Sequence, residues 1–451
     1  MSKPSPITVY NLLPKKNCGE CKVSSCMAFA LKLIEGEAEI EECPYLNEEQ
    51  KLKLVSIISP QIKAVSFGKN RLIIGGERAL HRHELRFFHP TAITINVSDM
   101  LAKEEIKERC LAIKNFKVER AGEKFEIDGI AVTADSVNEE KFKEAVKIVR
   151  ENSNLPLVLC SLNPKIIQSG VEEVSEEKPI LCSAKTDTLK SFIELSKKYA
   201  CPIALESSEL NELRLMAKKA EGLEILLSID GSFEKPFELL SNVITIRRCG
   251  IEEKMREFSH PILINLSLIR KKSLIQEKFF EPFLASMLIV RYANLLILHS
   301  IAIEALLPIF ILRQSIYANP RAPSTVPSGL YEVGKPNGNS PVLLTTNYAL
   351  TYYLVMGDLE SSKINCYLLV LDTQGMSVLN ALAGKLLYPE SIKKLIKDSG
   401  VEKKVSHRKL IIPGGIAKLK GEIEEATEWT AIVGPEDSSE LPIFLKKHFL
   451  Q

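Results

Sequence analysis

Between residues 91 and 299, short apolar runs alternate with amphipathic stretches. The runs are rich in Val, Ile and Leu with few polar interruptions, which is typical of parallel strands buried on both faces. The intervening stretches, such as Glu139 to Glu151 and Asp187 to Tyr199, repeat apolar residues at helical spacing. About eight such units in roughly 220 residues predict a (β/α)8 barrel. The candidate strands begin at Thr91, Gly129, Pro156, Pro179, Pro202, Leu223, Asn242, Pro261 and Asn294.

These runs are one too many for an eight-stranded barrel, and the run from Asn242 to Ile246 is the weakest candidate. In barrel enzymes the chemistry lies at the carboxyl ends of the strands. Asp135, Glu206, Asp230 and His299 lie at such ends and are candidates for an acid/base set. No two of them are held at a diagnostic spacing, so a docking and capping role for the barrel is favoured over a catalytic site.

A second, smaller α/β unit follows residues 319–339, a segment that contains four prolines and three glycines. That composition is typical of a loop and marks the clearest domain boundary in the chain. Beyond it, four apolar runs end close to Thr346, Asp372, Pro413 and Gly434, and helix-like segments follow most of them. This order predicts an open doubly wound sheet, a fold that binds its ligand across the carboxyl ends of its strands.

Small residues and hydroxyl groups gather at these expected strand ends. They are Thr345-Thr346, Thr373 to Ser377, Pro413 to Gly415 and Gly434-Pro435. Small side chains let a large flat ligand approach the backbone, while hydroxyls and helix N–H groups hydrogen-bond amide or phosphate oxygens. A G-x-G-x-x-G motif is absent, so a nicotinamide or flavin dinucleotide is not expected.

Four of the ten cysteines, Cys18, Cys21, Cys26 and Cys43, follow the spacing C-x2-C-x4-C-x16-C. A two-residue gap lets both thiolates of a turn point at one centre. Four thiolates of this kind suit a [4Fe-4S] cluster, in which each iron takes one Cys. A four-cysteine zinc site, which usually shows two C-x2-C pairs, is one alternative, and a disulfide framework is another. The other cysteines are scattered singly, as expected in a reduced cytoplasmic protein.

The segment from Gly68 to His89 is dense in His and Arg. His81 and His83 would share a face on a strand but would point apart on a helix. No Cys or acidic cluster completes a set of metal ligands with these residues and His89. We therefore interpret the segment as a hairpin that carries polar groups over the mouth of the barrel.

Charge and hydropathy limit the expected partners. The 59 basic and 57 acidic residues nearly cancel, so neither a nucleic-acid nor an anionic-membrane surface is expected. The most apolar stretch, Phe283 to Leu312, is broken by Arg291, Asn294, His299 and Glu304, so it lacks the roughly 18 uninterrupted apolar residues of a membrane span. The polar N-terminal stretch lacks the apolar core of a signal peptide, so none is expected. We expect a soluble cytoplasmic protein with domains at 1–60, 61–318 and 319–451, the first ending near Ser59-Pro60.

Several C-terminal stretches closely resemble the corrinoid domain of the corrinoid/iron–sulfur protein large subunit, which is the gamma subunit of the acetyl-CoA decarbonylase/synthase complex. They are TTNYALTYYLVMGDLESSK, LLVLDTQGMSVLNALAGK, SHRKLIIPGGIAKLKGEIEE and AIVGPED. The N-terminal cysteine spacing resembles the [4Fe-4S] domain of the same family, and the resemblance spans the whole chain. It implies an α/β protein with a small [4Fe-4S] domain, a central TIM-like barrel and a Rossmann-like, open α/β corrinoid-binding domain.

The resemblance also implies a methyl-group carrier. Corrinoid Co(I) accepts a methyl group from a methyl-tetrahydropterin and passes it to the nickel site of acetyl-CoA synthase, so the chain would be the methyltransferase component of the complex. The implied partners are a small barrel subunit in a heterodimer, a methyltransferase and the acetyl-CoA synthase/decarbonylase subunits. By the same resemblance Cys18, Cys21, Cys26 and Cys43 bind the cluster. The residues expected to line the corrinoid (cobamide) are Thr345, Thr346, Thr351, Gly375, Met376, Ser377, Val378 and Gly434.

Many B12 proteins carry D-x-H-x-x-G, whose His binds cobalt from below, but the equivalent loop here is Asp372-Thr373-Gln374-Gly375. Cobalt is therefore expected to be base-off without a protein ligand, and His407, just before a strand, is expected at the surface. An absent lower ligand favours the reduced metal, and the cluster would return Co(II) to Co(I). The alternatives are an iron–sulfur reductase with a small-molecule site in the barrel and a structural, zinc-bearing assembly subunit.

Overall fold

The computed structural model describes residues 5–35, 37–58, 61–69, 71–120, 123–229, 235–268, 279–319 and 323–449. The expected end of the first domain at Ser59-Pro60 and the candidate acid Asp230 lie outside these ranges. The chain forms two compact units, one of Met1–Val118 and Phe125–Ala318 and one of Glu119–Lys124 and Asn319–Gln451. None of the described helices has the length and apolar character that a membrane crossing requires.

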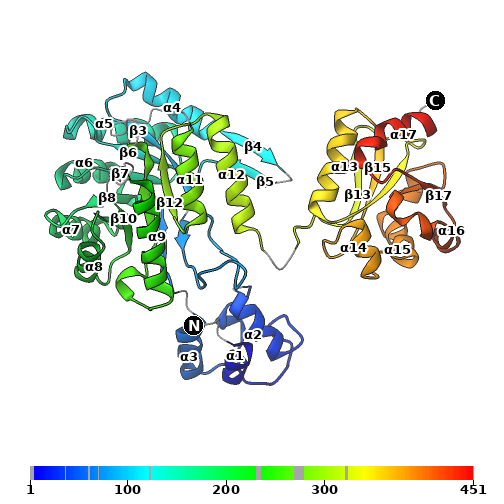
Figure 1. The fold of residues 1–451 in the computed structure, drawn as a ribbon, viewed down its shortest axis with the longest axis horizontal. Helices are drawn as coiled ribbons and strands as arrows, with labels where there is room; N and C mark the ends of the chain where they lie inside the picture. Colours follow the sequence, from blue (N-terminus) through cyan, green and yellow to red (C-terminus); the bar gives the residue numbers. More distant parts are fainter. Residues whose placement is uncertain are drawn as a thin grey trace. The chain divides into compact units, whose positions relative to one another are not determined.

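In the first unit, eight parallel strands close into a barrel, with helices around its outside (Figure 1). Around the barrel the strands follow chain order, and β12 pairs with β3 to close it. Each strand coincides with one of the apolar runs in the sequence, so the barrel prediction is confirmed. The strands are β3 (Ala92–Ser98), β6 (Gly129–Thr133), β7 (Leu157–Cys160), β8 (Ile180–Ala184), β9 (Ile203–Ser207), β10 (Ile225–Ile229), β11 (Ile262–Asn265) and β12 (Leu295–Leu298).

The helices that surround the barrel bury one apolar face each against the strands. In α5, for example, Phe142, Val146 and Val149 are buried at helical spacing, and the Asn138 side chain caps the helix by accepting a hydrogen bond from the N–H of Lys141. The helices are α4 (Lys103–Asn115), α5 (Glu139–Asn152), α6 (Pro164–Val174), α7 (Leu189–Tyr199), α8 (Leu210–Lys219), α9 (Pro236–Ile251), α11 (Phe280–Val290) and α12 (Ile303–Tyr317).

The weak candidate strand from Asn242 to Ile246 is part of α9, as its rank among the nine runs suggested. Leu239, Val243, Ile246 and Gly250 are buried at intervals of four, three and four residues, so the helix packs them on one face. A short apolar run within such a helix has the same local composition as a buried strand. Only the helical spacing of the buried residues, seen over the longer segment, distinguishes this helix from a buried strand.

An antiparallel hairpin of β1 (Ala64–Phe67) and β2 (Leu72–Gly75) packs apolar side chains into the barrel interior. It covers the amino end of the barrel, because a Cβ on Gly75 would lie 2.8 Å from Pro261, the residue before β11. The expected hairpin is therefore present, but the three histidines follow it rather than lie on it. The His81 and His83 rings stack with centroids 5.5 Å apart, and His89 Nδ1 lies 2.6 Å from the Gly75 carbonyl oxygen.

The second unit contains a five-stranded sheet in the order β13-β15-β14-β16-β17. The four expected strands are parallel: β14 (Val342–Thr346), β15 (Cys366–Leu371), β16 (Lys409–Ile412) and β17 (Thr430–Val433). The assignment of residues 319–339 to loop was wrong in part, because Gly329–Val333 forms the antiparallel edge strand β13. The strand is short and only half-buried, and the prolines and glycines around it are typical of a loop, so its sequence did not indicate a strand. A separate hairpin, β4 (Lys117–Arg120) with β5 (Glu123–Glu126), was not predicted.

Helices lie on both faces of this sheet (Figure 1). The sole tryptophan of the chain, Trp429, is 1% exposed in the core on one face. The helices are α13 (Ala349–Ser361), α14 (Val378–Ala383), α15 (Pro389–Ser399), α16 (Lys420–Thr427) and α17 (Leu441–His448). The cysteine-rich segment of the first unit has its own small core, formed by α1 (Pro6–Leu12), α2 (Cys26–Glu35), η1 (Ile40–Glu42) and α3 (Glu48–Ile58).

Candidate functional sites and family membership

The four cysteines of the N-terminal motif lie close to one another. Cys21, Cys26 and Cys43 are buried and Cys18 is exposed. Burial raises the pKa of the Cys21 thiol to about 12, and a hydrogen bond with Cys43 and the charges of all three other cysteines add to the effect. The three other thiols of the motif therefore lie near Cys21.

The loop before α2 adopts an unusual backbone that brings the motif together. Lys15, Asn17, Gly19 and Lys22 all have left-handed φ values, between 47° and 80°. Loops of this kind curl tightly and are typical of anion and iron–sulfur sites. Asn17 fastens the loop to α2, since its side-chain oxygen accepts a hydrogen bond of 2.8 Å from the N–H of Cys26 and its own N–H donates to the Cys26 sulfur. Across the described ranges, no three His, Cys, Asp or Glu side chains converge on one metal-ion position.

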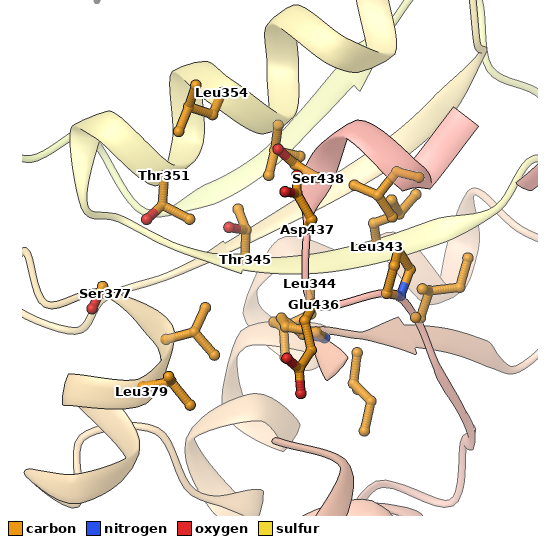
Figure 2. Close-up of a pocket in the computed structure, with 18 residues that line it drawn as sticks. Leu343, Leu344, Thr345, Thr351, Leu354, Ser377, Leu379, Glu436, Asp437 and Ser438 are labelled. Atoms are coloured by element: carbon orange, nitrogen blue, oxygen red, sulfur yellow. The ribbon is translucent and has the colours of Figure 1, made fainter. Parts of the chain in front are cut away.

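A cavity of about 580 Å³ opens in the second unit between the strand ends and helices α13 and α14 (Figure 2). Its wall combines apolar side chains with hydroxyl groups from separate elements. Figure 2 shows Thr345 on β14, Thr351 on α13 and Ser377 before α14 around the same hollow. The lining residues are Leu343, Leu344, Thr345, Thr351, Leu354, Val355, Ser377, Val378, Leu379, Ile411, Ile412, Pro413, Gly434, Pro435, Glu436, Asp437, Ser438 and Leu441.

Five of the eight residues expected around a corrinoid line this cavity: Thr345, Thr351, Ser377, Val378 and Gly434. Thr346 follows Thr345 on β14 and is not among the lining residues. Its side chain is fully buried, and within the described part of the chain its Oγ1 has no hydrogen-bond partner.

The remaining two expected residues, Gly375 and Met376, belong to the loop before α14 and are not among the lining residues. Gly375 has a φ of +75°, and a Cβ there would lie 2.8 Å from both Pro323 and Thr325. Its missing side chain therefore faces the chain segment that leads into the unit.

Asn347 organises this loop, and sequence reasoning missed it. Its buried side-chain oxygen accepts hydrogen bonds from the N–H groups of Thr373, at 2.9 Å, and Gly375, at 3.0 Å. Its amide nitrogen donates to the Asp372 carboxylate at 2.9 Å, which also accepts from the N–H of Gln374. The only sequence signal was an Asn placed directly after a strand end.

Two exposed leucines stand at the cavity wall. Leu354 is 54% exposed and Leu379 is 63% exposed, and both line the hollow (Figure 2). Neither was predicted. Exposed apolar side chains around a concave, hydroxyl-bearing wall are typical of a surface that a large ligand covers.

No imidazole is among the residues that line this cavity. His407 lies just before β16, at the amino ends of the strands, with Nε2 3.0 Å from the Ser340 carbonyl oxygen and Nδ1 accepting from the N–H of Lys409. Both ring nitrogens are therefore engaged away from the ligand edge. The expected position of His407 agrees with the structure.

The described members of the candidate acid/base set in the barrel have separate hydrogen-bond partners. Asp135 accepts a hydrogen bond from Ser98 at 2.6 Å, whereas Glu206 accepts one from Ser183. The backbone of His299 is held by Glu281 and Arg109. Of the described members of the set, Glu206 alone lines the cavity at the carboxyl end of the barrel.

The fold and sites together define a modular α/β protein that joins a four-cysteine segment to a parallel barrel and an open sheet with a large cavity. A family model described as CO dehydrogenase/acetyl-CoA synthase delta subunit matches residues 64–445, and one described as an Fe-S cluster matches residues 13–45.

The full-length relatives are more specific. The acetyl-CoA decarbonylase/synthase complex subunit gamma of Methanocaldococcus jannaschii is 40% identical, over 99% of this chain and 96% of its own. The same subunit of Methanothermobacter thermautotrophicus is 40% identical, over 97% and 98% respectively. The corrinoid/iron-sulfur protein large subunit of Moorella thermoacetica is 36% identical, over 98% of both chains. This chain belongs to the family of acetyl-CoA decarbonylase/synthase gamma subunits and corrinoid/iron–sulfur protein large subunits, and the resemblance seen in its sequence is confirmed.

Among solved structures, dihydropteroate synthase from Thermus thermophilus is similar over 57% of this chain and 100% of its own, with 12% identity and a TM-score of 0.38. A likeness at this level carries no argument about function.

Proposed function

We propose that this chain is the methyl-group carrier of an acetyl-CoA decarbonylase/synthase complex. A corrinoid would occupy the cavity of the second unit, and a [4Fe-4S] cluster would be bound by Cys18, Cys21, Cys26 and Cys43. The names of the relatives support both cofactors in kind, and the Fe-S family match covers all four cysteines.

The observation that carries the corrinoid proposal is the wall of the cavity at the carboxyl ends of the parallel strands. Thr345, Thr351 and Ser377 bring hydroxyls from three elements, and Gly434 leaves the backbone open there. The hydroxyl of Thr346, the residue that follows Thr345, is buried and lacks a partner among the described residues, which is costly unless a ligand supplies one. A cofactor edged with amide groups fits such a wall, because amides both donate and accept hydrogen bonds.

When bound, the corrinoid would supply a cobalt that takes up and releases a methyl group, and the cluster would supply electrons to it. The chain's own part is to hold and shield these groups. Leu354 and Leu379 would cover apolar surface of the ligand and exclude water, while the hydroxyls fix its edge. Since no imidazole lines the cavity, we propose that the cobalt has no lower ligand from the protein.

The four thiols suit the cluster because they are close together yet differ in exposure. Three are buried in the small core around α2, which shields a cluster from solvent, and the exposed Cys18 leaves one side open to electron transfer. We propose the domains 1–60, 61–318 and 319–451 for cluster, barrel and corrinoid. The proposed partners are a small barrel subunit, a methyltransferase acting on a methyl-tetrahydropterin, and the acetyl-CoA synthase subunits.

The test is anaerobic purification followed by metal analysis and spectroscopy. We expect cobalt together with about four irons per cobalt, as one four-iron cluster and one corrinoid require. The electron paramagnetic resonance signal of the cobalt should lack nitrogen superhyperfine splitting. Iron without cobalt would favour the reductase alternative, zinc without iron would favour the structural alternative, and nitrogen splitting would contradict the unligated cobalt.

A further inference from the structure

We infer that residues 76–89, called the strap below, form a releasable docking site for the cysteine-rich segment, and that Arg78 is the central contact of this site. The strap follows the hairpin of β1 and β2 at the amino end of the barrel. The inference rests on the proposed function, because it takes the docked segment to be the one that binds the [4Fe-4S] cluster. It adds what holds that segment while it is not delivering an electron.

Glu77 fixes the strap to the barrel. Its side chain is 6% exposed, and its carboxylate accepts a hydrogen bond of 2.8 Å from Arg247 of α9 and another from the side-chain amide of Asn294, the residue before β12. Further along the strap, Arg82 donates to the carbonyl oxygen of Ser315 in α12. A buried, hydrogen-bonded ion pair is costly to break, so the strap stays with the barrel.

The next residue, Arg78, contacts the cysteine-rich segment instead. Its Nη1 donates a hydrogen bond of 3.2 Å to the carbonyl oxygen of Leu33, in the last turn of α2. Carbonyls in the last turn of a helix lack partners within the helix and carry the negative end of its dipole, so a guanidinium group is a favourable partner for them. The adjacent residues Glu77 and Arg78 therefore connect the barrel to α2.

Two weaker contacts accompany this hydrogen bond. The guanidinium groups of Arg78 and Arg86 lie 5.7 and 5.0 Å from the ring centroid of Phe88, within the range of a cation–π interaction. Arg86 Nη2 also lies 4.0 Å from Oε1 of Glu37, just beyond α2. Both side chains of that pair are partly exposed, so it contributes little. The strap thus holds the segment by polar contacts that water partly reaches.

The cysteine-rich segment and the barrel do not share a core within the described residues. The buried apolar side chains of the segment form a cluster of their own, whereas those of the hairpin beside the strap pack into the barrel interior. Burial lowers the pKa of the Arg78 guanidinium, which shows that docking costs this group part of its hydration. Such a polar contact without a common core is expected to open and close readily.

Release matters because the two proposed cofactor sites belong to different units. The candidate corrinoid cavity is formed by residues of the second unit, and the cysteine-rich segment belongs to the first. One electron must therefore cross between the units: the reduced cluster loses it, and Co(II) gains it to become Co(I). A segment that can leave the strap is able to make this transfer.

Arg78 is a positioning residue in this scheme. Helix α2 runs for 10 residues from Cys26, and at 1.5 Å per residue it is about 15 Å long. Arg78 contacts the last turn of this helix, and the Cys26 thiol belongs to the first residue. Arg78 therefore sets how often the segment leaves the strap and does not alter the cluster itself.

The experiment compares the full-length, anaerobically purified wild-type protein with Arg78→Gln. Hydrogen exchange followed by mass spectrometry should show the last turn of α2 exchanging at least about threefold faster in the variant, because that turn loses its partner and opens more often. After rapid reduction of the cluster, visible absorbance follows the conversion of Co(II) to Co(I). This rate should rise about tenfold, because loss of a charged hydrogen bond raises the released population by about that factor.

Two further variants serve as controls. Arg214→Gln removes an arginine of α8 that is paired with Glu257, outside the strap, and should leave both measurements unchanged. Arg78→Lys keeps a charged donor and should give values between those of the wild type and Arg78→Gln. The iron content and the reduction potential of the cluster should be the same in all the variants, which separates docking from a change in the cluster.

Equal exchange and equal rates in Arg78→Gln and the wild type would overturn the docking role. Slower cobalt reduction in Arg78→Gln would also overturn the inference, because it would show that the docked segment is the one that delivers the electron. Absence of iron from the wild-type protein would refute the proposed function instead, and the exchange of α2 would still test the docking contact in that case.

Discussion

The side-chain oxygen of Asn347 accepts a hydrogen bond of 3.0 Å from the backbone N–H of Gly375. These residues follow two neighbouring strands, β14 and β15, and the contact fixes the loop that leads to Ser377 and the candidate corrinoid cavity. The same oxygen accepts from the N–H of Thr373. The buried side-chain amide of Asn347 therefore fixes the loop after β15, which leads to the cavity wall at Ser377.

Asn347→Ala should lower the free energy of unfolding of the second unit and reduce the cobalt content of the protein. The variant leaves the N–H groups of Thr373 and Gly375 buried without their acceptor, which costs about 2–4 kcal/mol in the free energy of unfolding. The fluorescence of Trp429, the only tryptophan, reports urea unfolding of this unit. Asn380→Ala, at an exposed position on α14, is the control and should change stability by less than about 0.5 kcal/mol. Equal stability of the two variants would contradict the role given to Asn347.

Gly375→Ala should also be destabilising, by about 1–3 kcal/mol, because the residue has a left-handed backbone and its Cβ would press on Pro323 and Thr325. Trp429 fluorescence measures this as well. Gly357→Ala is the matched control: a Cβ there meets nothing within 4 Å, and its helical position should make Ala neutral or stabilising by up to about 1 kcal/mol. If Gly375→Ala kept full stability and lost only its cobalt, the residue would instead face the corrinoid, as the family resemblance implies.

The strands of the barrel could be predicted from the sequence, whereas the edge strand of the second unit could not. Barrel strands are buried on both faces, so each leaves a continuous apolar run that is hard to mistake. The half-buried edge strand Gly329–Val333 leaves no such run, and its Pro and Gly neighbours resemble a loop. At the candidate site, the strand-end residues Thr345 and Gly434 were predictable because parallel strands bring their carboxyl ends together. Asn347 was not, because its role depends on a contact with residues 25 to 28 positions away.

Cys21→Ala should remove most of the iron while leaving the cobalt content unchanged. Cys21 is buried among the other three thiols of its motif, and a cluster that loses one of four ligands is weakly held. Metal analysis and visible absorbance measure both cofactors in one sample. Cys249→Ala, a half-buried cysteine on α9, is the control and should retain both metals. Reductive reactivation of the cobalt should fail in Cys21→Ala but not in Cys249→Ala. If Cys21→Ala were still reactivated, the electrons would reach the cobalt by another route.

Acid should destabilise the barrel through His260, which lies just before β11 and is 5% exposed. Burial, helped by the charge of Lys63, lowers its pKa from 6.5 to about 3, and its Nδ1 has no partner within the described residues. The unfolded chain therefore binds a proton below pH 6.5 that the folded chain binds only near pH 3. The stability that the neutral ring contributes is fully present above pH 6.5 and is lost as the pH falls from there toward 3. Between pH 7 and 5 this loss amounts to about 2 kcal/mol.

The free energy of unfolding is measured at pH 7 and pH 5 by urea unfolding followed by circular dichroism. Between these two pH values the wild-type protein should lose about 2 kcal/mol more than His260→Gln does, independently of how stable the variant is at pH 7. His83→Gln, which changes an exposed ring, should keep the wild-type slope, and a His260→Gln slope equal to wild type would mean that His260 titrates normally in the folded protein.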